Sequence, residues 1–250
     1  MLHFAYSHSS PAFNLAMEEV LLEPMVKVPD SPALFRVWHN QQKCVVIGRG
    51  EKIDQRVHLT HAKTDQIPVF RRVSGGGTVL HGPDNINLSF FLPFSHHSSL
   101  SNLKDSYRYI LSWVQQAIFQ SHQIKIDING SSDLVIENKK FSGTAQARKR
   151  HGLLHHMTLL LKADYAGMEK YLIEPDKRPE YRQRRVHQDF VIGLKDHTSD
   201  FNLESFLNAL KNILGVHEAF SPSPELFDKV NQLAEKKYCL QQWNHEGKLP

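Results

Sequence analysis

The sequence predicts an α+β fold, in which mixed or antiparallel β-sheets are flanked by helices. Short β-branched segments and longer amphipathic segments are both present, but they do not alternate regularly enough for a doubly wound parallel sheet. The chain has 250 residues, of which 40% are hydrophobic and 22% are charged, a balance typical of globular proteins. This length suits one domain with a sizeable core. We therefore expect residues 1–250 to form a single domain.

Helices are expected where apolar residues recur at three- and four-residue spacing. Pro11 stands at a first helical position, where proline is tolerated because its missing N–H would have no partner there. The clearest periodicity follows Ser101, which we expect to cap its helix. A second strongly amphipathic segment begins at Leu203. The five expected helices span residues 10–22, 103–118, 168–172, 203–214 and 222–238.

Strands are expected in the short runs of β-branched and aromatic residues between these helices. Residues 34–38 and 44–47 look like two strands joined by the polar turn 39–42. Asn138 to Lys140 is expected to lie in a short hairpin. Residues 174–202 are polar and rich in Arg and Pro, so we expect them to be irregular. The other expected strands span residues 69–70, 78–80, 86–92, 124–128, 134–136, 140–141 and 156–161.

Charge, cysteine content and hydropathy narrow the class of protein. The formal net charge is +4 and the pI is about 9.0, an excess that favours an anionic ligand or acidic partner but is too small to indicate nucleic-acid binding. Cys44 and Cys239 are the only cysteines, which excludes a disulfide framework and a cysteine-based zinc site and fits a reducing compartment. The first ten residues lack signal-peptide features, and no apolar run reaches the ~18 residues of a membrane helix. We therefore expect a cytoplasmic protein without membrane or nucleic-acid partners.

The segment from Arg71 to Ser89, RRVSGGGTVLHGPDNINLS, carries the strongest functional signal. Glycines 75–77 lack Cβ atoms, so the backbone can approach a ligand closely, and successive N–H groups in such a loop can surround an anion. Arg71 and Arg72 add fixed positive charge suited to phosphate or carboxylate. The pattern differs from the P-loop and from the dinucleotide-binding fingerprint, because a β-branched run follows the glycines. We predict an anion-holding loop, and a glycine-rich hairpin without a ligand is the alternative.

A second informative segment, residues 132–161, contains a lysine pair and a histidine pair. A lysine fixed on a strand can stabilise the negative charge that grows during acyl transfer. Successive strand residues face opposite sides, so only one of Lys139 and Lys140 is expected to face a site, unless both are solvated. The same geometry separates His155 from His156, whose spacing does not favour joint metal ligation. No metal site is predicted from the sequence.

Five ordered segments together resemble the lipoate-protein ligase A family, which belongs with biotin ligases and octanoyltransferases to one superfamily. They are the glycine-rich segment 71–89, KFSGTAQ at 140–146, HHMTLLL at 155–161, FNLAMEE at 13–19 and VVIGR at 45–49. The likeness extends in order from about residue 10 to about residue 243, so it covers a catalytic domain. The resemblance implies the fold of the biotin/lipoate protein ligase catalytic domain.

The resemblance also implies an enzyme that activates lipoate or octanoate with ATP and Mg²⁺ to an acyl-adenylate and transfers the acyl group to one lysine of a lipoyl carrier domain. The carrier would belong to the E2 component of a 2-oxoacid dehydrogenase, or be the glycine-cleavage H protein. Lys140 would be the catalytic lysine, in contact with the carboxyl and phosphate oxygens during both steps. A water-reactive adenylate requires a closing loop, and the Arg-rich segment 178–185 would be that loop, a carrier-docking patch or a solvated loop. The residues expected to bind substrate and adenylate are Arg72, Ser74, Gly75, Gly76, Gly77, Val79, His81, Asp133, His156 and Thr158.

Two other functions stay open at this stage. An octanoyltransferase moves acyl groups between carriers through a cysteine thioester, but neither Cys44 nor Cys239 lies in a segment that resembles the family's nucleophile. A non-catalytic lipoyl- or carrier-binding protein would suit the departures from the family pattern at Gly82, which replaces a usual acidic residue, and at Glu51-Lys52. The family's C-terminal accessory domain has no counterpart after Trp243, so we expect either a separate chain that supplies it or an enzyme that acts without it. The sequence distinguishes neither lipoate from octanoate nor a free acid from an acyl-carrier donor.

Overall fold

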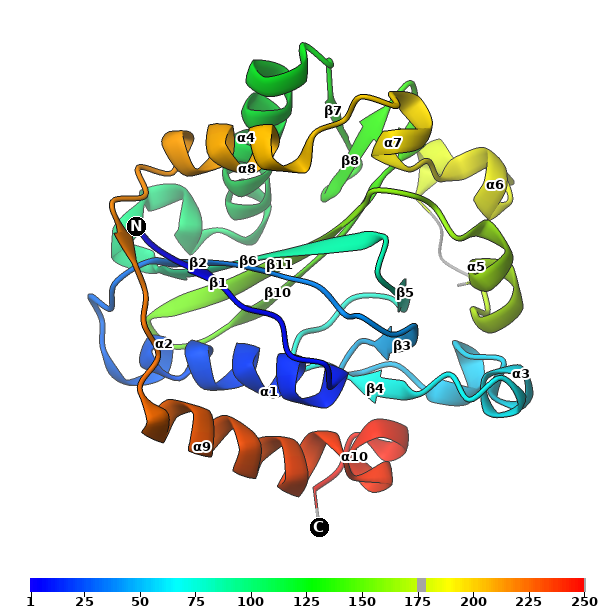
Figure 1. Ribbon diagram of the computed structural model, residues 1–250, viewed down its shortest axis with the longest axis horizontal. Helices are drawn as coiled ribbons and strands as arrows, with labels where there is room; N and C mark the ends of the chain where they lie inside the picture. Colours follow the sequence, from blue (N-terminus) through cyan, green and yellow to red (C-terminus); the bar gives the residue numbers. More distant parts are fainter. Residues whose placement is uncertain (175–178, 250) are drawn as a thin grey trace.

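A computed structural model of the protein describes residues 1–174 and 179–249. A six-stranded sheet lies between two layers of helices, and two three-stranded sheets lie beside it (Figure 1). The long helix α4 (Leu103–His122) lies over one face of the large sheet, and α1 (Pro11–Leu22) lies over the other. The predicted α+β class, with mixed sheets flanked by helices, is confirmed.

The large sheet has the strand order β10-β11-β6-β2-β1-β12. Strands β10, β11 and β6 are antiparallel to their neighbours. β2 is antiparallel to β6 but parallel to β1, and β1 is also parallel to β12. β6 and β11 are buried along their whole length, so they form the centre of the domain. The strands are β1 (Leu2–Ala5), β2 (Leu34–Trp38), β6 (Asn85–Pro93), β10 (Ser142–Arg148), β11 (Gly152–Leu160) and β12 (Glu218–Ala219).

The two small sheets have the orders β4-β3-β5 and β7-β8-β9. Residues 34–38 and 44–47 are strands as predicted, but they belong to different sheets, so the polar segment between them is a connection rather than a hairpin turn. Both strands are buried on both faces, and such strands carry no alternation that would identify their partners. The strands of the small sheets are β3 (Cys44–Ile47), β4 (Val69–Arg71), β5 (Val79–His81), β7 (Asp127–Asn129), β8 (Asp133–Ile136) and β9 (Lys139–Lys140).

The longer helices agree with the predicted periodicity, with two corrections. Asn102 rather than Ser101 caps α4, because the Asn102 Oδ1 accepts hydrogen bonds from the amides of Lys104 and Asp105 at 2.8 and 3.2 Å. The expected helix 222–238 is divided into α9 and a π-helical turn, and a further helix follows. The segment 174–202, expected to be irregular, also contains short helices at His187–Phe190 and Leu194–His197 among its described residues. No helix in the described ranges is long and apolar enough to cross a membrane. The remaining helices are α2 (Pro24–Lys27), α3 (Leu59–Thr64), α5 (Tyr165–Tyr171), α6 (His187–Phe190), α7 (Leu194–His197), α8 (Leu203–Ile213), α9 (Pro224–Leu233) and α10 (Gln241–Glu246).

The two faces of the large sheet differ in chemistry. Side chains such as Leu88, Phe90 and Met157 form an apolar core with α4 and α8. The opposite face, toward α1, carries buried polar side chains that include Ser89 and His156. Buried polar groups are costly unless they are hydrogen-bonded, so their concentration on one face indicates a functional site there.

Candidate active site

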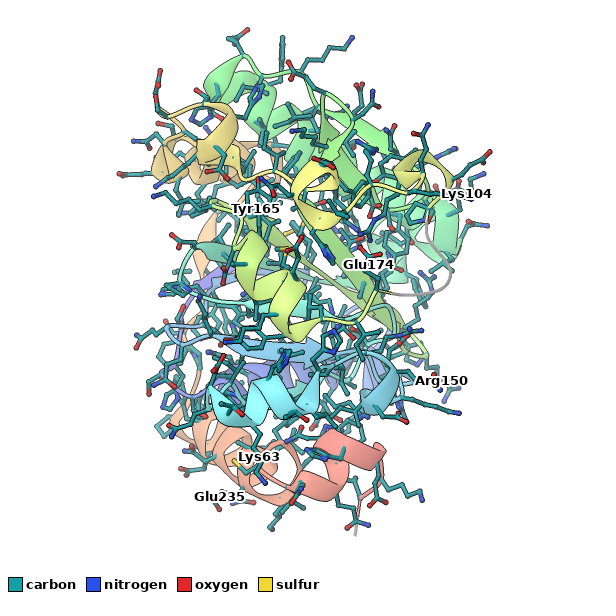
Figure 2. The ribbon with its side chains drawn as sticks, turned by 90° about the vertical axis from the view of Figure 1, so that its right-hand side faces the viewer. Lys63, Lys104, Arg150, Tyr165, Glu174 and Glu235 are labelled. Carbon is teal, nitrogen blue, oxygen red and sulfur yellow. The ribbon has the colours of Figure 1, made fainter. Side chains whose placement is uncertain are left out.

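Two cavities meet above the polar face of the large sheet. The smaller has a volume of about 140 Å³, and the larger has a volume of about 630 Å³. Figure 2 shows α5, whose first residue is Tyr165, and α3, which carries Lys63, together on the side of the molecule where the larger cavity lies. Lys140 lines both cavities and therefore lies at their junction. The other residues shared by both walls are Gly77, Thr78, Val79, Gly143 and Thr158.

Most of the residues that the sequence marked as a site surround these cavities. Ser74, Gly75 and Asp133 line neither of the two, and each instead contacts a residue that does. The remaining eight come from four separate chain segments, which the fold brings together. These eight are Arg72, Gly76, Gly77, Val79, His81, Lys140, His156 and Thr158.

Lys140 is held by an acidic residue of the neighbouring strand. Its Nζ lies 2.7 Å from Oδ1 of Asp133, and the hydroxyl of Tyr181 donates to the other oxygen of that carboxylate at 2.7 Å. Burial, together with the Asp133 charge, raises the pKa of Tyr181 well above its ordinary value, so the phenol keeps the proton that it donates. Lys139 lines neither of the two cavities, as the alternation of the strand predicts. The pair Asp133–Tyr181 therefore orients Lys140 toward the junction.

Arg72 uses its guanidinium to shape the glycine loop. It donates to the Ser74 hydroxyl at 2.9 Å and to the carbonyl oxygens of Gly75, Gly77 and Val46 at 2.5, 2.8 and 3.3 Å. Burial lowers the pKa of Arg72 to about 10, so it is still a cation at neutral pH. The arginine turns the loop carbonyls toward itself, and this leaves the loop amides to face elsewhere.

The glycine loop also packs very closely against another backbone segment. A Cβ atom on Gly48 would lie 1.9 Å from the carbonyl oxygen of Gly76, so position 48 requires glycine. Gly76 has φ of 84°, a conformation that favours glycine as well. Among the described residues, no hydrogen bond uses the amide N–H of Gly76 or Gly77. Both glycines line the larger cavity, so their unused amides are candidates to donate to an anion there.

A buried carboxylate supports the loop from the opposite side. Glu18 of α1 accepts a hydrogen bond from His156 Nδ1 at 2.8 Å and one from Ser89 at 2.5 Å, and His156 Nε2 lies 2.6 Å from the Ser74 hydroxyl. Burial alone raises the pKa of Glu18, but the charge and hydrogen bond of His156, with Arg36 and Ser89, lower it overall. Ser74 is 1% exposed and lines neither cavity, so this row of three side chains positions the loop rather than presenting a nucleophile.

His81 is a neutral part of the cavity wall. Its Nδ1 lies 3.1 Å from the Asn40 amide nitrogen, and its Nε2 lies 3.0 Å from the Thr158 hydroxyl. Burial lowers the pKa of His81 to about 3, and the charge of Arg72 acts in the same direction. Both ring nitrogens have partners within the protein, so the ring acts through Thr158.

The chain matches a known family along most of its length. Residues 10–215 match the lipoyl protein ligase A/B catalytic domain. The chain belongs to this family. The predicted resemblance is therefore confirmed for the catalytic domain.

Individual relatives support the same family. A probable lipoate-protein ligase A of Mycoplasma pneumoniae is 29% identical over 200 residues, which cover 80% of this chain and 57% of the relative, so the chain spans less than two thirds of that relative's length. The fold is similar to a structure of a bi-partite lipoate protein ligase from Thermoplasma acidophilum, with a TM-score of 0.83 and 20% identity over 98% of this chain and 95% of the other. It is also similar to a lipoate-protein ligase A bound with ATP, with a TM-score of 0.82 and 19% identity over 98% of each chain. The predicted lipoate-ligase fold is thus confirmed.

Several residues that line the two cavities escaped the sequence-based prediction. Glu18, Trp38 and Asn87 line the smaller cavity, and Glu51 and Phe190 line the larger one. They come from elements that are distant in sequence, so no local pattern connects them. Glu18 had the clearest available sequence signal, because it is a carboxylate within a helical segment of mostly apolar residues, PAFNLAMEEVLL.

The departure from the family pattern at Gly82 lies outside the lining of these two cavities. A Cβ atom at this position would lie 3.5 Å from Cγ of Lys43. The ammonium group of Lys43 pairs at 2.7 Å with Asp164, which supplies a carboxylate in this region. The loss of an acidic residue at position 82 therefore removes no group from either cavity wall.

The Arg-rich segment forms part of the wall of the larger cavity. Arg178 lies outside the described residues, whereas Pro179 and Arg182 line the cavity. Arg185 donates to the carbonyl oxygens of Asn138 and Tyr181 at 3.0 and 2.7 Å, which attaches the segment to the β8–β9 hairpin. Its expected role as a closing loop or docking patch stays a prediction.

Proposed function

We propose that this protein is a lipoate-protein ligase, which activates lipoate or octanoate with ATP and transfers the acyl group to a lysine of a lipoyl carrier domain. The observation that carries the proposal is the position of Lys140 at the junction of the two cavities. The smaller cavity suits an acyl chain, and the larger has the volume of a nucleotide-sized ligand site. The similar fold of an ATP-bound ligase supports this allocation.

In the first step, a carboxylate oxygen of the acid attacks the α-phosphorus of ATP. A new oxygen–phosphorus bond forms, the bond to the β-phosphate oxygen breaks, and pyrophosphate leaves with that electron pair. Two anions must approach each other, so cations and N–H donors are needed where their charge accumulates. The Lys140 ammonium group and the amides of Gly76 and Gly77 would supply these groups at the junction.

In the second step, the neutral amine of the carrier lysine attacks the carbonyl carbon of the acyl-adenylate. The carbon–nitrogen bond forms, the bond from carbon to the phosphate oxygen breaks, AMP leaves with the electron pair, and the amine proton passes to water. Negative charge grows on the carbonyl oxygen during the attack. Lys140 would stabilise it from the position that it holds in the first step, because Asp133 fixes its ammonium group.

Mg²⁺ would accompany ATP in this reaction. Within the described part of the chain, no group of three His, Cys, Asp or Glu side chains is arranged to hold a metal ion. Mg²⁺ in such enzymes is usually bound by one or two carboxylates together with phosphate oxygens and water. Glu51 is the carboxylate in the described lining of the larger cavity, so most ligands would come from the nucleotide and solvent.

We propose a lipoyl domain as the acyl acceptor, either of a 2-oxoacid dehydrogenase E2 component or of the glycine-cleavage H protein. The Thermoplasma structure described together with its E2 lipoyl domain supports this class of partner. The net charge of +4 favours an acidic carrier surface, and association should weaken as salt concentration rises. We also propose a cytoplasmic location, because both cysteines are free thiols, which suits a reducing compartment.

The intact mass of a carrier domain tests the proposal. The chain is incubated with the carrier, Mg²⁺ and either free acid plus ATP or an octanoyl carrier protein without ATP, with and without a candidate accessory chain. A lipoyl mass increase that needs ATP is expected. Transfer from the acyl carrier protein alone would instead identify a transferase, and ligand binding without pyrophosphate release would identify a non-catalytic binding protein.

The choice of lysine has its own test. Lys140→Ala should lower adenylate formation by roughly 10²–10³-fold, the cost of removing one group that stabilises developing charge. Lys139→Ala is the matched control and should retain activity, since Lys139 lines neither cavity. Equal losses in the two variants would show that Lys140 has been assigned the wrong role.

A further inference from the structure

Two buried donors in the wall of the smaller cavity have no partner among the described residues: the hydroxyl of Thr78 and Nδ2 of Asn87. Asn87 is the more deeply buried of the two residues, at 2% exposed. A buried donor without an acceptor is unfavourable, so native proteins rarely keep one unless another molecule supplies the acceptor. Its place in a cavity wall therefore indicates a ligand atom opposite Nδ2.

The strand register gives the position of Asn87 relative to residues near Lys140. Asn87 lies opposite Thr158 on β11 and Trp38 on β2, and Thr158 lies opposite Gly143 on β10. Asn87 is therefore two strand spacings, about 10 Å, from Gly143. Lys140 precedes Gly143 along the chain and lines the same cavity. With its carboxyl group near Lys140 and Gly143, an octanoyl-length chain in this cavity would be able to reach Asn87 with its far end.

The orientation of the Asn87 amide follows from a chain of hydrogen bonds that begins at Arg36. A guanidinium group only donates, so the Asn14 Oδ1 atom, 3.1 Å from Arg36, is the acceptor. The Asn14 amide nitrogen then donates to Asn40 Oδ1 at 3.0 Å. The Asn40 amide nitrogen is therefore the group that lies 3.1 Å from Nδ1 of His81, and it donates to that atom.

The second half of this series of hydrogen bonds determines the donors and acceptors from His81 to Asn87. Because Nδ1 of the neutral His81 ring accepts, its Nε2 bears the proton and donates to the Thr158 hydroxyl at 3.0 Å. The single proton of Thr158 then goes to Asn87 Oδ1 at 2.7 Å. The amide oxygen is thus committed to Thr158, and the NH₂ group of this cavity-lining residue is left without an acceptor. Because Arg36 can only donate, it determines both the tautomer of His81 and the orientation of the Asn87 amide.

We propose that Asn87 is a specificity-determining residue, whose Nδ2 donates a hydrogen bond to a dithiolane sulfur and so favours lipoate over octanoate. This inference rests on the proposed function for the place of the carboxyl group. Divalent sulfur is a weak acceptor, whereas the terminal methyl group of octanoate offers none and leaves the buried donor unpaired. We expect about tenfold discrimination, the low end of what one group in a pocket provides.

Equilibrium binding tests the role of Asn87. Calorimetric titration of the full chain with free lipoate and free octanoate, without ATP or carrier, should show about tenfold tighter binding of lipoate. Asn87→Leu, which is similar in size but apolar, should bind the two acids with nearly equal affinity, and Asn87→Ala should also lose the preference. Val46→Ala is the control, because it removes apolar wall from the same cavity and should weaken both acids while keeping their ratio.

Each outcome bears on one proposal or the other. Equal affinity of the natural chain for both acids, binding of neither, or a preference that survives in both Asn87 variants would overturn the inference. A chain that shows the preference and its loss, yet modifies no carrier, would contradict the ligase proposal and leave the role of Asn87 intact.

Discussion

Replacement of His155 by phenylalanine should change the stability of this protein in opposite directions at neutral and acidic pH. His155 is fully buried on the apolar face of the large sheet, with its ring centroid 5.2 Å from that of Tyr107 and 6.1 Å from that of Phe90. Its Nδ1 lies 3.1 Å from the Gln146 amide nitrogen, and its Nε2 has no partner within the described ranges. A phenylalanine ring of similar shape should therefore occupy the same space.

The direction of the pH effect follows from the pKa of His155. Burial, with a smaller contribution from the charge of His156, lowers this pKa from 6.5 to about 3. Below pH 6.5 the unfolded chain binds a proton that the native protein does not bind, so this group reduces stability as pH falls from 6.5 toward 3. At pH 5 the reduction amounts to about 2 kcal/mol.

Urea unfolding at two pH values measures the effect. At pH 7.5 His155→Phe loses one hydrogen bond to Gln146 and should be less stable than the natural chain by about 1 kcal/mol. At pH 5 it should be more stable by about 1 kcal/mol, because phenylalanine takes up no proton in the unfolded state. Ile110→Val, in the same apolar cluster, is the control and should cost about 1 kcal/mol at both pH values. The same difference between His155→Phe and the natural chain at both pH values would refute the reasoning.

Two further substitutions test the scaffold and the alternative thioester route. Arg71 donates to five carbonyl oxygens, among them those of Trp243 and His245 in α10. A lysine ammonium group cannot reproduce the planar arrangement of donors in a guanidinium group. Arg71→Lys should therefore lower the free energy of unfolding by ~2–4 kcal/mol in urea titrations. The exposed Arg49→Lys should change it by less than ~0.5 kcal/mol, and similar losses in both would contradict this role. Burial raises the pKa of Cys44 to about 12, which disfavours the reactive thiolate. Cys44→Ser should therefore keep carrier acylation in the mass assay. Loss of transfer by a folded variant would instead support the thioester route.

The glycine loop and Lys140 were assigned to a site from local sequence signals, and the structure places both at the cavities. Three consecutive glycines allow the backbone to approach a ligand closely. Strand alternation indicates that only one of Lys139 and Lys140 faces a site, and the family resemblance selects Lys140. The fold class likewise followed from segment periodicity. The sequence did not show that Arg71 and Arg72 would use their guanidinium groups on backbone carbonyls, since a charge in the sequence carries no information about its acceptor.

The sheet partners and the polar walls were not predictable in the same way. Residues 34–38 and 44–47 are equally buried on both faces, so their patterns do not reveal that they belong to different sheets. Glu18 and Asn87 lie on separate elements, and their partners are 71 or more positions away in the sequence. Only strand register brings such residues into one wall.

By itself, the sequence determined the α+β class and the family of the catalytic domain, because these depend on short-range periodicity and on contiguous motifs. The roles assigned to the glycine loop and to Lys140 stay predictions. The tertiary structure alone decided how two cavities meet at Lys140 and which way the amide of Asn87 points. Those properties depend on long-range hydrogen bonds whose donors and acceptors are fixed only after the strands have paired.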